Sequence, residues 1–279
     1  MKRRIGFLFT ILLLCAVSAL LIIRENRTVS VTSYTVKSSR LPAALEGYRI
    51  AQVSDLHNET FGDGNDILLQ LLQEAEPDII VITGDLIDSV ETDLSVGIAF
   101  AEAAVSIAPT YFVTGNHEAA IRKHRQLARD LKAVGVTVLR DEKITVTAGN
   151  ESLTILGLKD PNFFPGNPAE AAGQSLTKLM TDEEDTYTIL LAHRPELFDV
   201  YVAGGVDLIL SGHAHGGQFR LPWIGGLYAP AQGLFPAYDG GCYTEGNTTM
   251  VVSRGIGNSR FPFRVNNPPE IVLVELRLS

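Results

Sequence analysis

The chain has 279 residues, 46% of them hydrophobic, and a formal net charge of −9. This composition excludes an intrinsically disordered chain and is sufficient for one large domain with its own core. Residues 1–24 hold four of the 23 basic residues and no acidic residue, so the remaining chain carries a net charge of −13. Because an acidic surface repels polyanions, we expect no nucleic acid among its partners.

The first predicted element is an apolar helix close to the N-terminus. Residues 5–23 contain no charged side chain. As a helix they would reach about 28 Å at 1.5 Å per residue, close to the ~30 Å hydrocarbon core of a bilayer. Lys2, Arg3 and Arg4 precede this segment, which favours a cytoplasmic N-terminus. The pattern therefore predicts a transmembrane helix.

Different kinds of N-terminal signal compete for this segment. Residues 17–19 match the cleavage site of a secretory signal peptide, and the two arginines of residues 3–4 permit a twin-arginine export signal. The apolar run nevertheless continues past that site through residues 20–23. We predict that residues 1–28 are an uncleaved signal anchor with its flank. Residues 29–279 would then form one domain on the extracytoplasmic side of the cell membrane, held by a single pass.

The rest of the chain alternates between strand and helix patterns. Short apolar or alternating runs predict strands at residues 29–36, 48–53, 79–82, 111–113, 136–139, 144–147, 153–158, 189–191, 208–210 and 271–278. Amphipathic runs predict helices at residues 67–72, 94–107, 121–134 and 169–180, and a further helix that begins at Pro195. Such alternation predicts an α/β domain, with additional antiparallel strands in its second half.

Polar residues of the kind that bind metals directly follow five of these strands. They are Asp55 and His57, Asp85, Asn116 and His117, His193, and His213 and His215. Sites in α/β sheets form where the carboxyl ends of strands meet, so we expect these side chains to converge. Any one motif alone is better explained by turn or capping chemistry. Five of the six histidines occupy such positions, however, and chance does not explain that.

The donor types of this set indicate a centre with two metal ions. Carboxylate, amide and imidazole donors without thiolates suit Mn, Fe or Zn. The set has too many ligands for one tetrahedral ion, but seven of its eight residues would fill two sites if one carboxylate bridges and solvent completes the coordination. Two ions about 3.5–4 Å apart clamp both oxygens of an in-line displacement and lower the pKa of a bridging water. Their charge would also attract a phosphate to an acidic protein.

The ordered motifs resemble those of a known family. The chain is similar to the calcineurin-like metallophosphoesterases, in particular to their bacterial membrane-anchored branch, in five blocks: Asp55-x-His57, Gly84-Asp85-x-x-Asp88, Gly115-Asn116-His117-Glu118, His193 and Gly212-His213-x-His215. The likeness runs from about residue 51 to residue 215 and is specific, because all five blocks are intact. It implies a four-layer α/β/β/α sandwich.

The resemblance also implies a role for each residue of the set. The ligands of the first ion would be Asp55, His57 and His215, and those of the second ion Asn116, His193 and His213. Asp85 would bridge the two ions. His117 would bind no metal but would face the phosphate and assist departure of the leaving oxygen. The implied activity is hydrolysis of phosphate monoesters or diesters by attack of a metal-bridging hydroxide, and the enzyme class that we expect is a phosphodiesterase.

Two other functions are weighed against this one. A catalytically idle relative that acts as a binding or scaffold protein would be expected to have lost ligands, and all of them are present. The metallo-β-lactamase class requires a His-x-His-x-Asp-His run. Here His213-Ala214-His215 is followed by Gly216-Gly217-Gln218, which does not match. The sequence therefore favours the phosphoesterase.

A candidate substrate-binding segment follows the last motif. Between residues 219 and 238, apolar side chains such as Trp223 are interspersed with glycines and prolines. Apolar side chains usually pack in the interior, but the glycines and prolines favour an irregular surface loop. Such a loop on an anchored protein would suit a lipid-linked phosphate ester, with Arg254, Arg260 or Arg264 at the phosphate oxygens. The expected substrate contacts are Arg254, Arg260 and Trp223.

Overall fold

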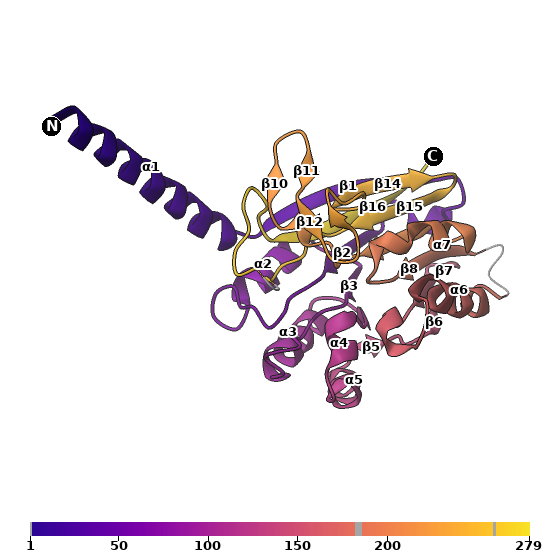
Figure 1. The fold of residues 1–279 in the computed structure, drawn as a ribbon. Coiled ribbons are helices and arrows are strands. Elements are labelled where there is room, and N and C mark those ends of the chain that lie inside the picture. Colours follow the sequence, from indigo (N-terminus) through magenta and orange to yellow (C-terminus); the bar gives the residue numbers. More distant parts are fainter. Residues whose placement is uncertain (1, 182–185, 259–260) are drawn as a thin grey trace.

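Two six-stranded β-sheets lie face to face at the centre of the fold (Figure 1). The computed structural model describes residues 2–181, 186–258 and 261–279. Within these residues, helices cover the outer face of each sheet, and one long helix, α1 (Lys2–Asn26), projects away from the rest of the chain.

The first sheet is mostly parallel. Its strands in spatial order are β1 (Ser30–Ser38), β16 (Glu270–Leu278), β2 (Arg49–Val53), β3 (Ile79–Thr83), β4 (Thr110–Val113) and β5 (Thr137–Val138). All neighbours are parallel except β16 and β2. The outer face is covered by α2 (Asp66–Glu74), α3 (Ser95–Val105) and α5 (His124–Ala133). Strands β3 and β4 are buried along their whole length, as expected for apolar strands covered on both faces.

The second sheet has a parallel centre and antiparallel edges. Its strands in spatial order are β14 (Gly241–Glu245), β15 (Thr248–Val252), β9 (Leu208–Ser211), β8 (Tyr187–Leu191), β7 (Glu151–Gly157) and β6 (Glu142–Ala148). Only the edge strands β14 and β6 run antiparallel to their neighbours. This confirms the expected antiparallel strands in the second half. The outer face carries α6 (Pro168–Leu179) and α7 (Phe198–Ala203).

Three apolar cores separate the layers. The central core lies between the sheets and joins side chains such as Val81 and Val113 of the first sheet to Ile189 and Leu210 of the second. One outer core packs α2, α3 and α5 on the first sheet, and the other packs α6 and α7 on the second. Helix, sheet, sheet and helix therefore follow one another, and the predicted four-layer α/β/β/α sandwich is confirmed.

Several short elements differ from the sequence-based expectation. A five-residue helix, α4 (Asn116–Ala120), begins within a motif, so the helix predicted from residue 121 begins only at His124. The expected loop after residue 212 contains two small hairpins, β10 (Arg220–Leu221) with β11 (Gly225–Gly226) and β12 (Tyr228–Ala229) with β13 (Gly233–Leu234). Two-residue strands are too short to show a period of two, so the sequence pattern does not reveal them.

Helix α1 is long and apolar enough to cross a membrane, and its segment Phe9–Asn26 is not buried against the domain. Its C-terminal end is fixed to the loop at residues 264–267. The Asn26 side chain donates to the Arg264 carbonyl at 2.8 Å and accepts from the Arg264 amide at 2.7 Å. The Glu25 carboxylate accepts from the amides of Asn266 and Asn267. The helix therefore meets the domain at a defined place.

Candidate metal centre

The five motif-bearing loops meet at one end of the two sheets. Strands β2, β3 and β4 are parallel neighbours in the first sheet, and β8 and β9 are parallel neighbours in the second. Their carboxyl ends lie at the same end of the domain, where ligand sites of α/β sheets form. The buried members of the set are Asp55, His57, Asp85, His193, His213 and His215, whereas Asn116 and His117 are partly exposed.

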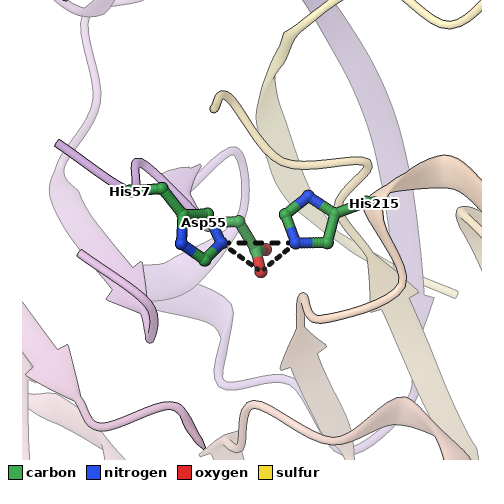
Figure 2. Close-up of side chains that lie close together, drawn as sticks. All are labelled: Asp55, His57 and His215. Carbon is green, nitrogen blue, oxygen red and sulfur yellow. Dashed lines mark hydrogen bonds and ion pairs between the residues drawn. The ribbon is translucent and has the colours of Figure 1, made fainter. Parts of the chain in front are cut away.

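Asp55, His57 and His215 form the first cluster, in which one ligand atom of each residue lies within 4.8 Å of the others. Figure 2 shows the three side chains directed towards one another. Nε2 of His215 lies 3.3 Å from Nε2 of His57 and 3.5 Å from Oδ1 of Asp55. Residues that are 158 positions apart in the chain are thus in contact.

Asp85, His193 and His213 form the second cluster, again with one ligand atom each within 4.8 Å. Oδ2 of Asp85 lies 3.2 Å from Nε2 of His193 in this cluster and 3.7 Å from Nε2 of His57 in the first. Asp85 therefore lies between the two clusters. That is the position a carboxylate must occupy to contact two ions.

Five of these residues have left-handed backbone conformations. They are Asp55 (φ 55°), His57 (φ 49°), Asp85 (φ 50°), His213 (φ 67°) and His215 (φ 48°). Such conformations are uncommon outside glycine and cost on the order of 1–3 kcal/mol each. Asp and His tolerate them better than β-branched residues do. Strain of this kind concentrates at functional sites, and here it coincides with the two clusters.

Hydrogen bonds between the loops hold these conformations. The amides of Asp55 and His57 donate to the carbonyls of Gly84 and Asp85, each at 3.0 Å, so the loops after β2 and β3 are joined. The amide of His213 donates to both carboxylate oxygens of Asp55, at 3.1 and 3.2 Å. The two sheets are therefore linked at the site itself.

Glycines provide the space for this close approach. A Cβ atom on Gly212 would overlap Oγ of Ser54 and would press on Oδ2 of Asp55. Gly84 has φ +93°, and a Cβ atom there would lie 2.6 Å from Nδ1 of His193. Only glycine leaves room for the ligand-bearing side chains at these two turns.

The carboxylates and imidazoles shift one another's pKa values. Burial raises the pKa of Asp85, but the charges of His193 and His57 outweigh this effect and hold it well below its usual range. Burial lowers the pKa of His193, but Asp85 outweighs it and raises the pKa to about 10. In His213 and His215 burial dominates and lowers both pKa values well below the usual range. Neutral imidazoles of this kind offer a lone pair to a metal ion.

The backbone fixes the tautomer of His193. Its Nδ1 lies 2.7 Å from the carbonyl oxygen of Thr83, the last residue of β3. A carbonyl only accepts, so Nδ1 carries the proton and Nε2, which faces Asp85, is the atom available to a metal. The same kind of contact orients metal-binding histidines generally.

His117 is placed differently from the histidines of the two clusters. Its Nδ1 accepts from the amide of Ser89 at 2.9 Å, so the proton of the neutral ring lies on Nε2. Burial lowers the pKa of His117, which favours the neutral ring. Asp88 contacts Nδ1 of both His117 and His57, at 3.4 and 3.6 Å. His57, Asp88 and His117 also have ligand atoms within 4.8 Å, but two of them are only partly buried.

Two side chains that help to position the clusters were not among the site residues predicted from the sequence. The buried carboxylate of Glu118 accepts from the amides of Asp85 at 2.9 Å, Gly115 at 2.7 Å and Ile87 at 3.1 Å, and it thus joins the loops after β3 and β4. Burial raises the pKa of Glu118 to about 7. Its location at the end of a motif that follows a strand was a usable signal.

Arg194 is the second such side chain. It ion-pairs with the buried carboxylate of Asp160 at 2.6 Å, and its Nη1 lies 3.1 Å from Nε2 of His213. The guanidinium is thereby held against the second cluster. Arg194 directly follows His193 in the sequence, but nothing in the pattern indicates that its side chain turns towards His213.

Two pockets open beside Asn116 and His117. One, of about 270 Å³, is lined by Asp85, His213 and His215 at its base and by Tyr228, Pro230, Ala231 and Phe261 at its rim. The other, of about 690 Å³, is lined by acidic residues that include Glu59, Asp88 and Glu91. The cavity over the clusters therefore has an apolar side and an acidic side.

Two of the expected substrate contacts, Arg254 and Trp223, do not line the 270 Å³ pocket. The guanidinium of Arg254 ion-pairs with the buried Glu270 on β16, which holds it at the first sheet. Trp223 is fully exposed at the tip of the β10–β11 hairpin and does not line this pocket. Arg264 is buried, and its guanidinium donates to the carbonyls of Arg254 and Gly257. Arg260 lies outside the described residues.

The donor set fits metal ions. Each cluster combines one carboxylate with two imidazoles, and oxygen and nitrogen donors of this kind suit divalent transition ions. Oδ1 of Asn116 is buried and, among the described residues, has no hydrogen-bond partner. A buried acceptor without a partner is costly unless something else occupies it. A metal ion bound at the second cluster would satisfy this oxygen.

Comparisons with known proteins agree with this chemistry. A family model described as calcineurin-like phosphoesterase matches residues 48–217. The chain is 31% identical to the uncharacterized metallophosphoesterase YkuE of Bacillus subtilis, over 91% of this chain and 87% of that protein. It is 29% identical to phosphodiesterase YaeI of Escherichia coli, over 82% of each. The structure of TT1561 of Thermus thermophilus matches with a TM-score of 0.53 at 15% identity, over 75% of this chain and 90% of that one, which supports the fold alone.

Proposed function

Because the chain belongs to the calcineurin-like phosphoesterase family, we propose that it is a phosphodiesterase with a dinuclear metal centre built from the two clusters. The observation that carries the proposal is the position of Asp85 between the clusters, beside His117, at the base of a pocket of about 270 Å³. The preference for diesters is supported by the relative YaeI, which is named a phosphodiesterase.

The two clusters divide the seven proposed ligands between two ions. Asp55, His57 and His215 would hold the first, Asn116, His193 and His213 the second, and Asp85 would contact both. Bound Mn, Fe or Zn ions would supply a water nucleophile of lowered pKa and positive charge for the phosphate oxygens. Since Asn116 is neutral, it leaves that charge undiminished.

His117 is the proposed donor to the leaving oxygen. The Ser89 amide donates to Nδ1 and so keeps the ring proton on Nε2. Since His117 lines both pockets, Nε2 can meet an ester oxygen bound between them. A positioned imidazole of this kind contributes roughly 10²–10⁴ to the rate of ester cleavage.

The pocket walls favour an ester with an apolar group. An anionic phosphodiester is repelled from the side that carries Glu59, Asp88 and Glu91. Its apolar group can instead contact Tyr228 and Phe261 at the rim of the other pocket. This supports the proposal that the substrate is a lipid-linked phosphate ester.

The N-terminal helix supports a location at the cell membrane. We propose that residues 1–28 remain as a single-pass anchor, because α1 is long and apolar enough to cross a bilayer and its end is hydrogen-bonded to the domain. The basic residues 2–4 favour a cytoplasmic N-terminus. Residues 29–279 would then form the catalytic domain on the extracytoplasmic side.

The test is an assay of the purified full chain with bis(p-nitrophenyl) phosphate and p-nitrophenyl phosphate, before and after chelation. We expect two ions per chain, loss of activity with chelator, recovery with Mn, Fe or Zn, and faster turnover of the diester. Two bound ions without hydrolysis of either ester would favour the binding or scaffold alternative. A chain that binds no metal would remove the proposal.

A further inference from the structure

Exposed apolar side chains are concentrated in one part of the domain. Outside α1, and among the described residues, eight of the twelve large apolar side chains that are exposed lie between residues 221 and 263. They are Leu221, Trp223, Ile224, Tyr228, Leu234, Phe235, Phe261 and Phe263. We name this set the apolar face. Isolated exposed apolar residues are ordinary, but a contiguous group of them marks an interaction surface.

Backbone and ring contacts make the apolar face continuous. Phe219 packs against Phe261 and Phe263, with ring centroids 5.6 and 5.5 Å apart. The Leu227 amide donates to the Phe219 carbonyl at 2.8 Å, and the Phe235 amide donates to the Leu227 carbonyl at 2.9 Å. Both small hairpins and the loop of Phe261 are therefore held together as one unit.

The C-terminal end of α1 contacts the same unit. The side chain of Asn26 pairs with the backbone of Arg264, next to Phe263. The Arg220 amide in β10 donates to the Val265 carbonyl at 3.0 Å, so the hairpin is bonded to the loop that α1 contacts. In Figure 1, α1 extends to the upper left and the β10–β11 hairpin extends upward, both from the left part of the domain.

From these contacts we propose that the apolar face docks on the bilayer that α1 crosses. The inference rests on the proposed anchoring by α1. A helix that leaves a bilayer at Asn26 brings the loop at residues 261–267 to the membrane surface, because the two are directly bonded. The fully exposed Trp223 at the hairpin tip is of a residue type that is enriched at that interface.

Docking on the bilayer places the proposed active site at the lipid surface. Tyr228 and Phe261 belong both to the apolar face and to the rim of the pocket over the two clusters. A lipid phosphate could therefore move from the headgroup layer into the pocket without crossing open water. The apolar face determines the orientation of the pocket, whereas α1 alone would only tether it.

The chain contains a built-in probe of this contact, because Trp223 is its only tryptophan. The full chain is reconstituted into vesicles of phosphatidylglycerol and phosphatidylethanolamine, with and without brominated acyl chains. We expect the Trp223 emission to shift to shorter wavelength relative to detergent, to lose most of its intensity with brominated lipid, and to show several-fold weaker quenching by aqueous iodide.

Two tryptophan-relocated chains complete the experiment. In Trp223→Ser with Phe235→Trp the probe is on the second hairpin, and brominated lipid should again quench it. In Trp223→Ser with Leu278→Trp the probe is at the far end of β16, about 26 Å along the strand from Glu270, and it should behave as a residue in water. Leu278 is 42% exposed and pairs with Ser38, at the end of β1 remote from α1.

The outcomes separate this inference from the proposals on which it rests. If the chain stays with the vesicles after a salt wash, but iodide quenches Trp223 as strongly as it quenches the tryptophan of Leu278→Trp, the docking proposal is wrong and the anchor proposal stands. A chain that does not float with vesicles would overturn both. An emission shift in detergent that grows with protein concentration, without quenching by brominated lipid, would assign the face to a second copy of the chain. Phosphodiester hydrolysis is measured separately and decides the activity.

Discussion

At the scale of single residues, Asp85 connects the parts of the site. Oδ1 accepts from the His117 amide at 2.8 Å, and Oδ2 lies near both His57 and His193. Its own amide is held by Glu118. A change at Asp85 therefore affects both clusters and the His117 loop together.

The first prediction concerns Asp85→Asn. The amide keeps the shape of the side chain but loses the charge that two ions would share. We expect Asp85→Asn to lose more turnover than Asp55→Asn does. The loss should exceed the roughly 10–100-fold that is typical when a residue hydrogen-bonded to a metal ligand is replaced. The variant should also bind fewer than two ions per chain. Turnover and metal content by mass spectrometry are the measurements, with the exposed Asp63→Asn as control. Normal activity in Asp85→Asn would exclude a bridging role.

The second prediction concerns His117→Ala. Because His117 is expected to donate a proton and not to bind metal, the variant should retain two ions and its folding stability while turnover falls roughly 10²–10⁴-fold. Metal content, thermal unfolding and kcat are measured together. Loss of an ion would instead make His117 a ligand, in line with its proximity to His57 and Asp88. Lost stability with turnover unchanged would make it a structural residue.

At the scale of elements, the turns that follow the strands determine the positions of the two clusters. The left-handed conformations of Asp55 and His213 bring the loop after β2 against the loop after β9, and Gly212 is the residue that permits this approach. The positions of the clusters therefore depend on small residues that bind nothing themselves.

The third prediction tests that dependence with Gly212→Ala. The added methyl group overlaps Oγ of Ser54 and crowds Oδ2 of Asp55, so the first cluster must shift. We expect lower metal content and a loss of about 1–3 kcal/mol in the free energy of unfolding, typical of overpacking. Gly173→Ala in α6 is the matched control, since its methyl group meets Val200 at an ordinary 3.5 Å. Full metal content in Gly212→Ala would show that the turn tolerates the shift.

The two small hairpins beside the pocket are the second element-scale feature. The fourth prediction is that Trp223→Ser with Phe235→Ser lowers turnover of a lipid phosphodiester several-fold more than turnover of bis(p-nitrophenyl) phosphate. Both side chains are exposed, so their replacement removes little packing. Equal losses on the two substrates would indicate a structural role for the hairpins and would remove the support for a lipid-linked ester.

At the scale of the whole molecule, α1 and the domain form one connected assembly. Glu25 and Asn26 bond to the loop at residues 264–267, and the Asn267 side chain in turn donates to the His215 carbonyl at 2.8 Å. A line of hydrogen bonds thus runs from the end of the apolar helix to a residue of the first cluster. The orientation of the site relative to α1 is fixed by these contacts.

The fifth prediction concerns the N-terminus in the cell. If α1 is an uncleaved anchor, the mature protein should begin near Met1 and remain with membranes after a high-salt wash, because apolar burial does not weaken with salt. N-terminal sequencing of the membrane fraction and of the wash is the measurement. A mature N-terminus at Leu20 in the soluble fraction would instead establish a cleaved signal.

The sequence by itself determined the candidate donor residues and the α/β class of the fold. The sequence shows a potential metal ligand after each of five short apolar runs: Asp55, Asp85, Asn116, His193 and His213. These positions can be predicted because strand ends and donor types are local properties. The apolar length of residues 5–23 is local too. For the same reason the alternation of strands and helices was sufficient to predict an α/β domain, whereas the four layers were predicted from the resemblance to the calcineurin-like family.

Only the tertiary structure decided how these residues are placed relative to one another. Packing of the two sheets brings His57 to His215 and puts Asp85 between the clusters, and these contacts join residues that lie far apart in the chain. The fold also turns Arg254 towards Glu270 and leaves the Trp223 side chain exposed. A guanidinium or an indole suits either a substrate or an internal partner. The partner is selected by the neighbours that the fold supplies, and no local pattern contains that information.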